Sequence, residues 1–211
     1  MAVLLISCKK SLDLAPYGSV ASTEAFSTPA KCLVSLMGVY DAAQSGAYTD
    51  GTLRGYPFGA ANIEQSDCRG EDLINIATFF QITYQATYNA SSANCVGHWN
   101  SLYALINKAN VCIDGFRQAG NAGVLSAAVA AQYEAECRFL RALSHHELMI
   151  HWARPYRDGN GSQIGIPYRD FAVNVPATVD MVRTLPRAVS DTVYRRILRD
   201  LDYAETNLAA S

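Results

Sequence analysis

Apolar residues recur at three- and four-residue steps along four long segments of the chain, and this period is typical of helices with one buried face. The segments are residues 27–43, 97–116, 126–152 and 190–208. Thr28 with Pro29, and Ser126, supply helix start signals at two of them. The pattern therefore predicts an all-α fold.

Two stretches between these segments lack a sustained period. Residues 44–94 contain scattered glycines and polar clusters, which indicate loops, with room for one short helix over 71–80. Residues 153–189 hold four of the seven prolines, so we expect an extended, turn-rich segment with no helix. Gly115 and Gly120 are expected to help end the second long helix.

The order of the helices predicts a tetratricopeptide-like repeat scaffold with long loops, because an antiparallel pair is followed by a further helix. The last helix carries an apolar stripe of Val193, Ile197, Leu201, Ala204 and Leu208. No later helix follows to cover this stripe. We therefore expect the chain to be an incomplete domain whose C-terminal half is absent.

The amino terminus reads as a targeting signal. Residues 1–7 are almost wholly apolar and end at Cys8, which two lysines follow. Leu5-Ile6-Ser7-Cys8 resembles the lipobox of bacterial lipoproteins, so Cys8 is the predicted lipidation site, and the acyl chains would hold the protein at a membrane. The signal is short and has no basic start, so it is read as truncated. The alternative is a short buried segment with an incidental cysteine.

Charge and cysteine usage narrow the possible partners. The 17 basic and 19 acidic residues are scattered and give a net charge of −2, which indicates no nucleic-acid partner. The six cysteines include no C-x-x-C pair, which argues against a zinc or thioredoxin-type site. We expect most of them to be small buried apolar residues.

The sequence gives little support for a catalytic or metal-binding site. His146 and His151 are five residues apart, about 140° around a helix, so they cannot share one metal ion from one face. The sequence has no nucleotide-binding or serine-hydrolase motif, and we expect neither an enzyme nor a cofactor. Carboxylate neighbours such as Glu64 and Asp67 could serve glycoside hydrolysis but are read as a solvated surface.

Two arginines on the third long helix could have a structural or a ligand-binding role. Arg138 and Arg141 lie near Glu134 and Glu136, at spacings that allow ion pairs stitching the repeats together. A clamp for an acidic sugar is the competing interpretation.

Four stretches, in order, resemble the N-terminal half of the SusD/RagB family of outer-membrane lipoproteins. These are the lipobox with Leu12-Asp13-Leu14-Ala15-Pro16 and Glu24-Ala25-Phe26; Trp99-Asn100-Ser101-Leu102-Tyr103 with Ile106 and Ala109-Asn110; Ala135 to Leu143; and Pro186-Arg187 with Val193-Tyr194, Ile197 and Asp200-Leu201. The chain departs from the family at Cys137 and at His151-Trp152-Ala153-Arg154-Pro155.

The resemblance implies a surface-exposed, lipid-anchored protein of the outer membrane. Such a protein captures oligosaccharides for a TonB-dependent, SusC-like transporter, has a tetratricopeptide-like scaffold and lacks catalytic machinery. It also implies three parts: a truncated signal at 1–8, an extended linker at 9–27 and a SusD-like helical domain at 28–211. The alternative function is a helical scaffold that binds another protein and has no glycan affinity.

Glycan binding needs aromatic faces for the C–H side of a sugar ring and planar polar groups for its hydroxyls. Trp99 and Tyr103 lie on a helical stripe and are expected to be core. The irregular stretch 66–88 precedes that helix, where the family's ligand loops lie. The candidate ligand-binding residues there are Asp67, Arg69, Asp72, Asn75, Phe79, Tyr84 and Tyr88.

Overall fold

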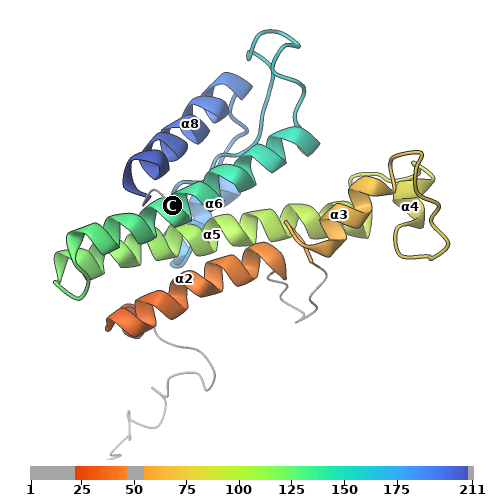
Figure 1. The fold of residues 1–211 in the computed structure, drawn as a ribbon. Helices are drawn as coiled ribbons and strands as arrows, with labels where there is room; N and C mark the ends of the chain where they lie inside the picture. The colour runs from red at the N-terminus through yellow and green to blue at the C-terminus, as the bar shows by residue number, and fades with distance from the viewer. Residues whose placement is uncertain (1–21, 47–54, 209–211) are drawn as a thin grey trace, which may run out of the picture.

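A computed structural model of the protein describes residues 22–46 and 55–208 (Figure 1). Within them the regular structure is helical, with one isolated β-bridge between Ile164 and Val189, so the predicted all-α fold is confirmed. The helices are α1 Ser22–Ala25, α2 Pro29–Gln44, α3 Ala60–Asp67, α4 Gln81–Tyr84, α5 Ala93–Asn121, α6 Ala127–Trp152, α7 Pro176–Thr184 and α8 Ser190–Asn207.

Long helices α5 and α6 form the centre of the fold as an antiparallel pair (Figure 1). Helix α2 packs along α5, and α8 packs along α6, so the four predicted helices make the scaffold. Thr28 and Ser126 cap α2 and α6 as expected, each accepting a hydrogen bond from a first-turn backbone N–H.

Gly115 and Gly120 do not end α5, which continues to residue 121. A Cβ atom at Gly115 would lie 2.4 Å from the Phe26 ring, and one at Gly120 would lie 2.9 Å from Ala130 Cβ. These glycines therefore allow close packing against α5, and the expectation that they help end the helix is wrong.

Short helices differ from the sequence-based expectation in two places. Residues 71–80 form turns and irregular backbone, and helices α3 and α4 lie on either side of them instead. Residues 153–189, expected to contain no helix, include α7. Pro176 begins it, because a proline in the first helical turn loses no hydrogen bond.

Two buried clusters form the main core. The first lies between α2, α5 and α6, around Phe116 and Leu105. The second lies between α5, α6, α8 and the segment after α6, and includes Leu148, Val193 and Ile197. The stripe on α8 is thus largely covered by α6, and the expectation that it had no partner is wrong.

The segment after α6 is fastened by side chains of α5 rather than by a sheet. Asn107 Oδ1 accepts a hydrogen bond from the backbone N–H of Val173 at 2.7 Å, and its Nδ2 donates to the Val173 carbonyl at 3.3 Å. Asn110 Nδ2 donates to the carbonyl of Phe171 at 2.9 Å. Side-chain amides of α5 therefore satisfy backbone groups that a helix or strand would otherwise pair.

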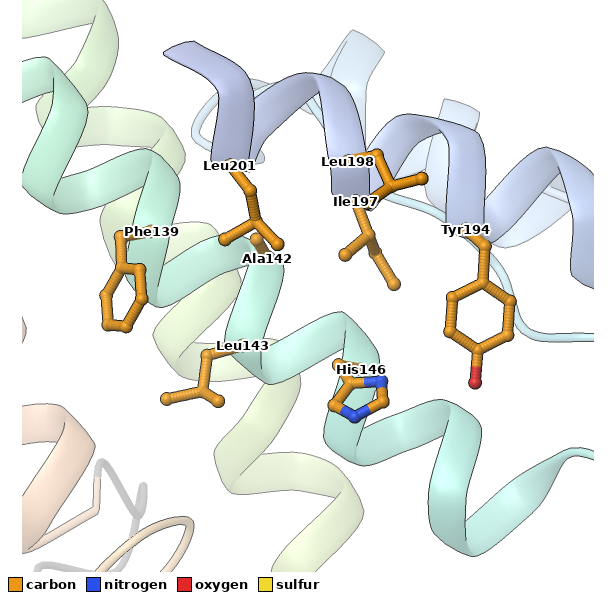
Figure 2. Close-up of a pocket in the computed structure, with 8 residues that line it drawn as sticks. All are labelled: Phe139, Ala142, Leu143, His146, Tyr194, Ile197, Leu198 and Leu201. Carbon is orange, nitrogen blue, oxygen red and sulfur yellow. The ribbon is translucent and has the colours of Figure 1, made fainter. Parts of the chain in front are cut away.

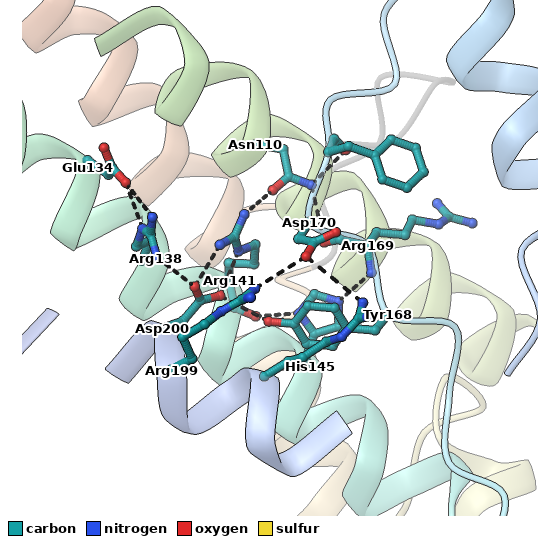
Figure 3. Close-up of polar contacts among 12 residues, drawn as sticks. Asn110, Glu134, Arg138, Arg141, His145, Tyr168, Arg169, Asp170, Arg199 and Asp200 are labelled. Atoms are coloured by element: carbon teal, nitrogen blue, oxygen red, sulfur yellow. Dashed lines mark hydrogen bonds and ion pairs between the residues drawn. The ribbon is translucent and has the colours of Figure 1, made fainter. Parts of the chain in front are cut away.

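A buried polar network joins α6 to α8 (Figure 3). Asp200 of α8 is fully buried and accepts hydrogen bonds from Arg141 Nε at 2.8 Å and Nη2 at 2.7 Å. Arg138 Nη1 lies 3.3 Å from the same carboxylate, and Tyr168 donates its hydroxyl to it at 3.0 Å. Arg141 also donates to Asn110 at 2.7 Å.

The expected pairing of the α6 arginines is confirmed in part. Arg138 pairs with Glu134 one turn earlier, at 2.7 Å. Arg141 instead pairs with Asp200 of α8, and Glu136 accepts a hydrogen bond from Tyr40. Both arginines therefore join α6 to α8 through Asp200. Because their guanidinium groups are already paired with carboxylates, the structure does not support a clamp for an acidic sugar at these residues.

The cysteines behave as expected where they are described. Cys32, Cys68, Cys112 and Cys137 are buried, and Cys95 is half-buried; all five are free thiols. Cys8 and most of the predicted linker lie outside the described residues. Among the helices that the structure describes, none is long and apolar enough to cross a membrane.

Candidate functional site

The loops between α3 and α5 gather at one end of the molecule, beside the start of α5 (Figure 1). A small core of Tyr56, Ala61, Cys68 and Phe80 holds α3 and the following loop together. Tyr56 also hydrogen-bonds Gln65 of α3 through its hydroxyl. The irregular stretch 66–88 is therefore attached to a rigid helical end.

A pocket of about 260 Å³ lies between these loops and the ends of α5 and α6; we call it the His98 pocket. Helix α3 contributes one lining residue, the loop before α5 three, α5 two and α6 two. The lining residues are Gln65, Tyr88, Asn89, Ala90, Cys95, His98, His151 and Trp152.

Aromatic rings form the inner wall of the His98 pocket. The His98 ring stacks on Tyr56, with ring centres 5.1 Å apart and planes 23° apart. It meets the edges of His151 at 5.1 Å and of Trp152 at 5.3 Å. Trp152 in turn contacts Trp99. These contacts fix the ring orientations before any ligand arrives, which reduces the entropy lost on binding.

His98 is buried, with 3% of its surface exposed, and its Nε2 atom has no hydrogen-bond partner among the described residues. Burial, together with the neighbouring His151, lowers the pKa of His98 to about 4. The ring is therefore neutral at pH 7. An unpaired buried nitrogen costs about 1–3 kcal/mol, so its position in a pocket wall suggests that a ligand or water completes the bonding.

Hydrogen bonds link Arg69, His151 and Glu147 along the rim of the His98 pocket. His151 Nε2 lies 2.9 Å from Glu147 Oε1, and Arg69 Nη1 lies 3.4 Å from His151 Nδ1. Because a guanidinium only donates, Nδ1 accepts from Arg69 and Nε2–H donates to Glu147. The His151 hydrogen bond lowers the pKa of Glu147. Arg69 also lies 5.8 Å from the ring centre of Tyr88.

A second pocket, of about 540 Å³, lies between the end of α3 and the loop that follows it. Asp67, Asn75 and Phe79 line it, together with Glu64, Cys68, Leu73, Ile74, Ile76, Ala77 and Phe80. Asn75 Oδ1 accepts a hydrogen bond from the backbone N–H of Ala77, while its buried Nδ2 has no partner in the part of the chain that the structure describes. A smaller cavity of about 210 Å³ connects Phe79 to Tyr88.

The predicted ligand residues divide into groups. Tyr88 lines the His98 pocket, and Arg69 contacts two of its wall residues. The second pocket collects Asp67, Asn75 and Phe79. Asp72 is exposed and lines none of the three cavities, and the same holds for Tyr84 of α4.

Several wall residues were not predicted from the sequence, namely Gln65, His98, His151 and Trp152. They lie on helices, where periodicity favours a core position. The signal that could have found them is the aromatic and histidine cluster at the start of one long helix and the end of the next, since an antiparallel pair brings these two ends together. Tyr103 is buried and Trp99 is half-buried in the second core, which confirms their scaffold role.

A different cavity, of about 330 Å³, lies in the groove between α6 and α8 (Figure 2). Its walls are almost wholly apolar, and it offers few partners for sugar hydroxyls. Phe139 and Leu198 flank it and are exposed. The other lining residues are Ala142, Leu143, His146, Tyr194, Ile197 and Leu201.

The sequence comparison decides the family. The SusD-like family, described as "Starch-binding associating with outer membrane", matches residues 12–211. The chain belongs to the SusD-like family. Among curated proteins, no match was found.

Solved structures of SusD-like proteins share the fold. A SusD superfamily protein from Bacteroides fragilis is 25% identical with a TM-score of 0.70, covering 84% of this chain and 39% of its own. A SusD-like carbohydrate binding protein from Bacteroides vulgatus is 16% identical, with a TM-score of 0.70 and coverages of 87% and 36%. The SusD-like chain described here thus spans less than half the length of these relatives.

Proposed function

We propose that this protein binds oligosaccharides at the cell surface and delivers them to a TonB-dependent outer-membrane transporter. The observation that carries the proposal is the His98 pocket, in which rigid aromatic rings and an unpaired buried imidazole nitrogen meet. Membership of a family described as starch-binding and associated with the outer membrane supports it. The SusC-like transporter and the lipid anchor at Cys8 follow from the family resemblance and the lipobox.

The pocket walls match the two faces of a sugar ring. Tyr88 and Trp152 can cover the apolar C–H face, while Gln65, Asn89 and His98 can bond its hydroxyls. Sites for drug-sized ligands span about 300–1,000 Å³. The 260 Å³ pocket is slightly smaller, which suits one sugar unit with the rest of the chain extending over the loops.

Two tyrosines allow a matched test of this site. Tyr88 and Tyr84 are exposed to 47% and 41%, but only Tyr88 lines the His98 pocket. Tyr88→Ala should weaken glycan binding by about tenfold or more, because stacking on an aromatic face is lost, whereas Tyr84→Ala should bind as the wild type does. Glycan-array screening of the full-length protein, followed by titration calorimetry, measures both.

Two results would contradict the proposal. If the full-length protein retained no glycan on the array, oligosaccharide binding would be wrong. If the two tyrosine variants bound equally well, the site would have to lie elsewhere. Both variants should keep the wild-type melting temperature, since neither side chain is buried.

A second candidate function is binding of another protein without glycan affinity. The apolar groove between α6 and α8 favours it, because an exposed cluster of large apolar side chains is typical of interaction surfaces. This function predicts that substitutions in the groove alter association while leaving glycans unbound in every variant.

A further inference from the structure

We infer that the sugar held in the His98 pocket carries a carboxylate, so that uronate-containing oligosaccharides are the ligand class. The inference rests on the proposed glycan-binding function and specifies its substrate. Two observations support it: Arg69 presents a positive charge at the pocket rim, and the lining residues include no carboxylate.

Arg69 presents a positive charge without a carboxylate partner. Its side chain is exposed, and within the described part of the chain its contacts are His151 and Tyr88. Some other exposed arginines have such a partner, for example Arg154 with Asp158 at 3.0 Å and Arg183 with Asp180 at 3.2 Å. Among the described residues, Arg157 and Arg187 are also exposed and have none, but neither lines the His98 pocket. Arg69 therefore brings a cation without a carboxylate partner among the described residues to the rim of the His98 pocket.

No carboxylate is present among the eight lining residues of the His98 pocket. The adjacent acid, Glu147, accepts a hydrogen bond from the far side of the His151 ring. It orients His151 so that the Nδ1 edge turns toward Arg69. An anion entering here would meet Arg69 without a competing carboxylate in the wall.

The place of Arg69 relative to the stacking ring suits a uronate. The guanidinium lies over Tyr88, with its central carbon 5.8 Å from the ring centre. The carboxylate of a uronate projects from the edge of the pyranose, so a sugar stacked beside Tyr88 would direct it to the rim. A guanidinium can donate two parallel N–H bonds to a carboxylate. The unpaired Nε2 of His98 then remains for a ring hydroxyl.

Titration calorimetry of the full-length protein with matched oligosaccharides tests the inference. The acidic probes are tetramers of galacturonate and of mannuronate, and the neutral probe is the methyl ester of the galacturonate tetramer. We expect at least one acidic tetramer to bind and its methyl ester to bind about tenfold or more weakly, because esterification removes the charge. Affinity for the acid should fall as salt rises.

Arg69→Gln should weaken acid binding by about tenfold or more and leave the ester unchanged. Arg183→Gln is the control, since it removes the same charge from an exposed site on α7. Preference for neutral glycans, or equal binding of acid and ester, would overturn the uronate inference and leave glycan binding standing. Binding of no glycan on the array or in these titrations would overturn the proposed function itself.

Discussion

The Nε2 atom of His145 accepts a hydrogen bond from the backbone N–H of Arg169 at 3.1 Å (Figure 3). On the other side of the ring, Nδ1 lies 2.9 Å from the carbonyl oxygen of Arg141, which can only accept. The two contacts fix the neutral tautomer with its proton on Nδ1. Burial lowers the pKa of His145 to about 3, and protonation of Nε2 would break the bond to Arg169.

The free energy of unfolding should therefore fall as the pH drops below 6.5. The unfolded chain takes up a proton near pH 6.5, whereas folded His145 takes one up only near pH 3, so acid favours the unfolded state throughout this range. The contribution is up to about 1.4 kcal/mol per pH unit. His98, whose pKa is lowered to about 4, should add a similar slope.

Urea unfolding between pH 7.5 and 5 measures this slope. His145→Gln should reduce it, because glutamine does not titrate. His146→Gln changes an exposed neighbour on the same helix and should leave the slope as in the wild type. A stability that stays flat below pH 6.5, or equal slopes in wild type and His145→Gln, would contradict the prediction.

Removing the buried charge on α8 should destabilise the protein strongly. Asp200→Asn would leave Arg141 buried without its carboxylate, and breaking a buried ion pair from one side costs about 3–5 kcal/mol. Asp202→Asn, an exposed change on the same helix, should cost about 0.5 kcal/mol or less. Calorimetric melting of both variants distinguishes them, and a small effect of Asp200→Asn would refute the structural role given to this network.

The groove between α6 and α8 should promote association of the protein. Leu198 is 55% exposed at its edge, and Leu198→Glu would place a charge in an apolar contact. We expect this variant to be less associated than the wild type in multi-angle light scattering. Val34→Glu, on α2 and 68% exposed, is the matched control. A wild-type protein that is monomeric at all concentrations would exclude the effect.

Lipidation is predicted at Cys8, which lies outside the described residues. Cys8→Ala, expressed with a complete signal sequence, should lose radiolabelled palmitate and leave the membrane fraction, because the lipobox thiol that would carry the acyl chains is removed. Cys95→Ala is a suitable control, since Cys95 is a half-buried thiol of α5. Retained label and membrane location in Cys8→Ala would contradict the anchor.

Helical periodicity predicted the four scaffold helices because each buries one face along its whole length. It could not predict α7, whose nine residues have no buried side chain and depend on Pro176 and local capping. Nor could it predict how residues 163–175 are fastened. Asn107 and Asn110 hold that segment from about 60 positions away in sequence, and no local pattern encodes such contacts.

The candidate site was predictable only on its loop side. Tyr88 and Arg69 stand out because they are aromatic and charged residues in irregular sequence. His98 and Trp152 lie on helices, where the same period serves both buried and pocket-lining positions. Whether a helical residue faces the core or a cavity depends on where the neighbouring helix ends, and this is a property of the folded chain.

The ion pair between Asp200 and Arg141 limits how far α8 can slide along α6. Leucine and isoleucine contacts between α6 and α8 have no preferred direction, so alone they would permit several axial positions. A shift of α8 by one turn, about 5.4 Å, would break the ion pair of Asp200 with Arg141 and leave these two buried charges without their partners, while Arg138 would keep Glu134. A single aspartate thus fixes the axial position of α8 on α6, and with it the alignment of the side chains from both helices that line the groove between them.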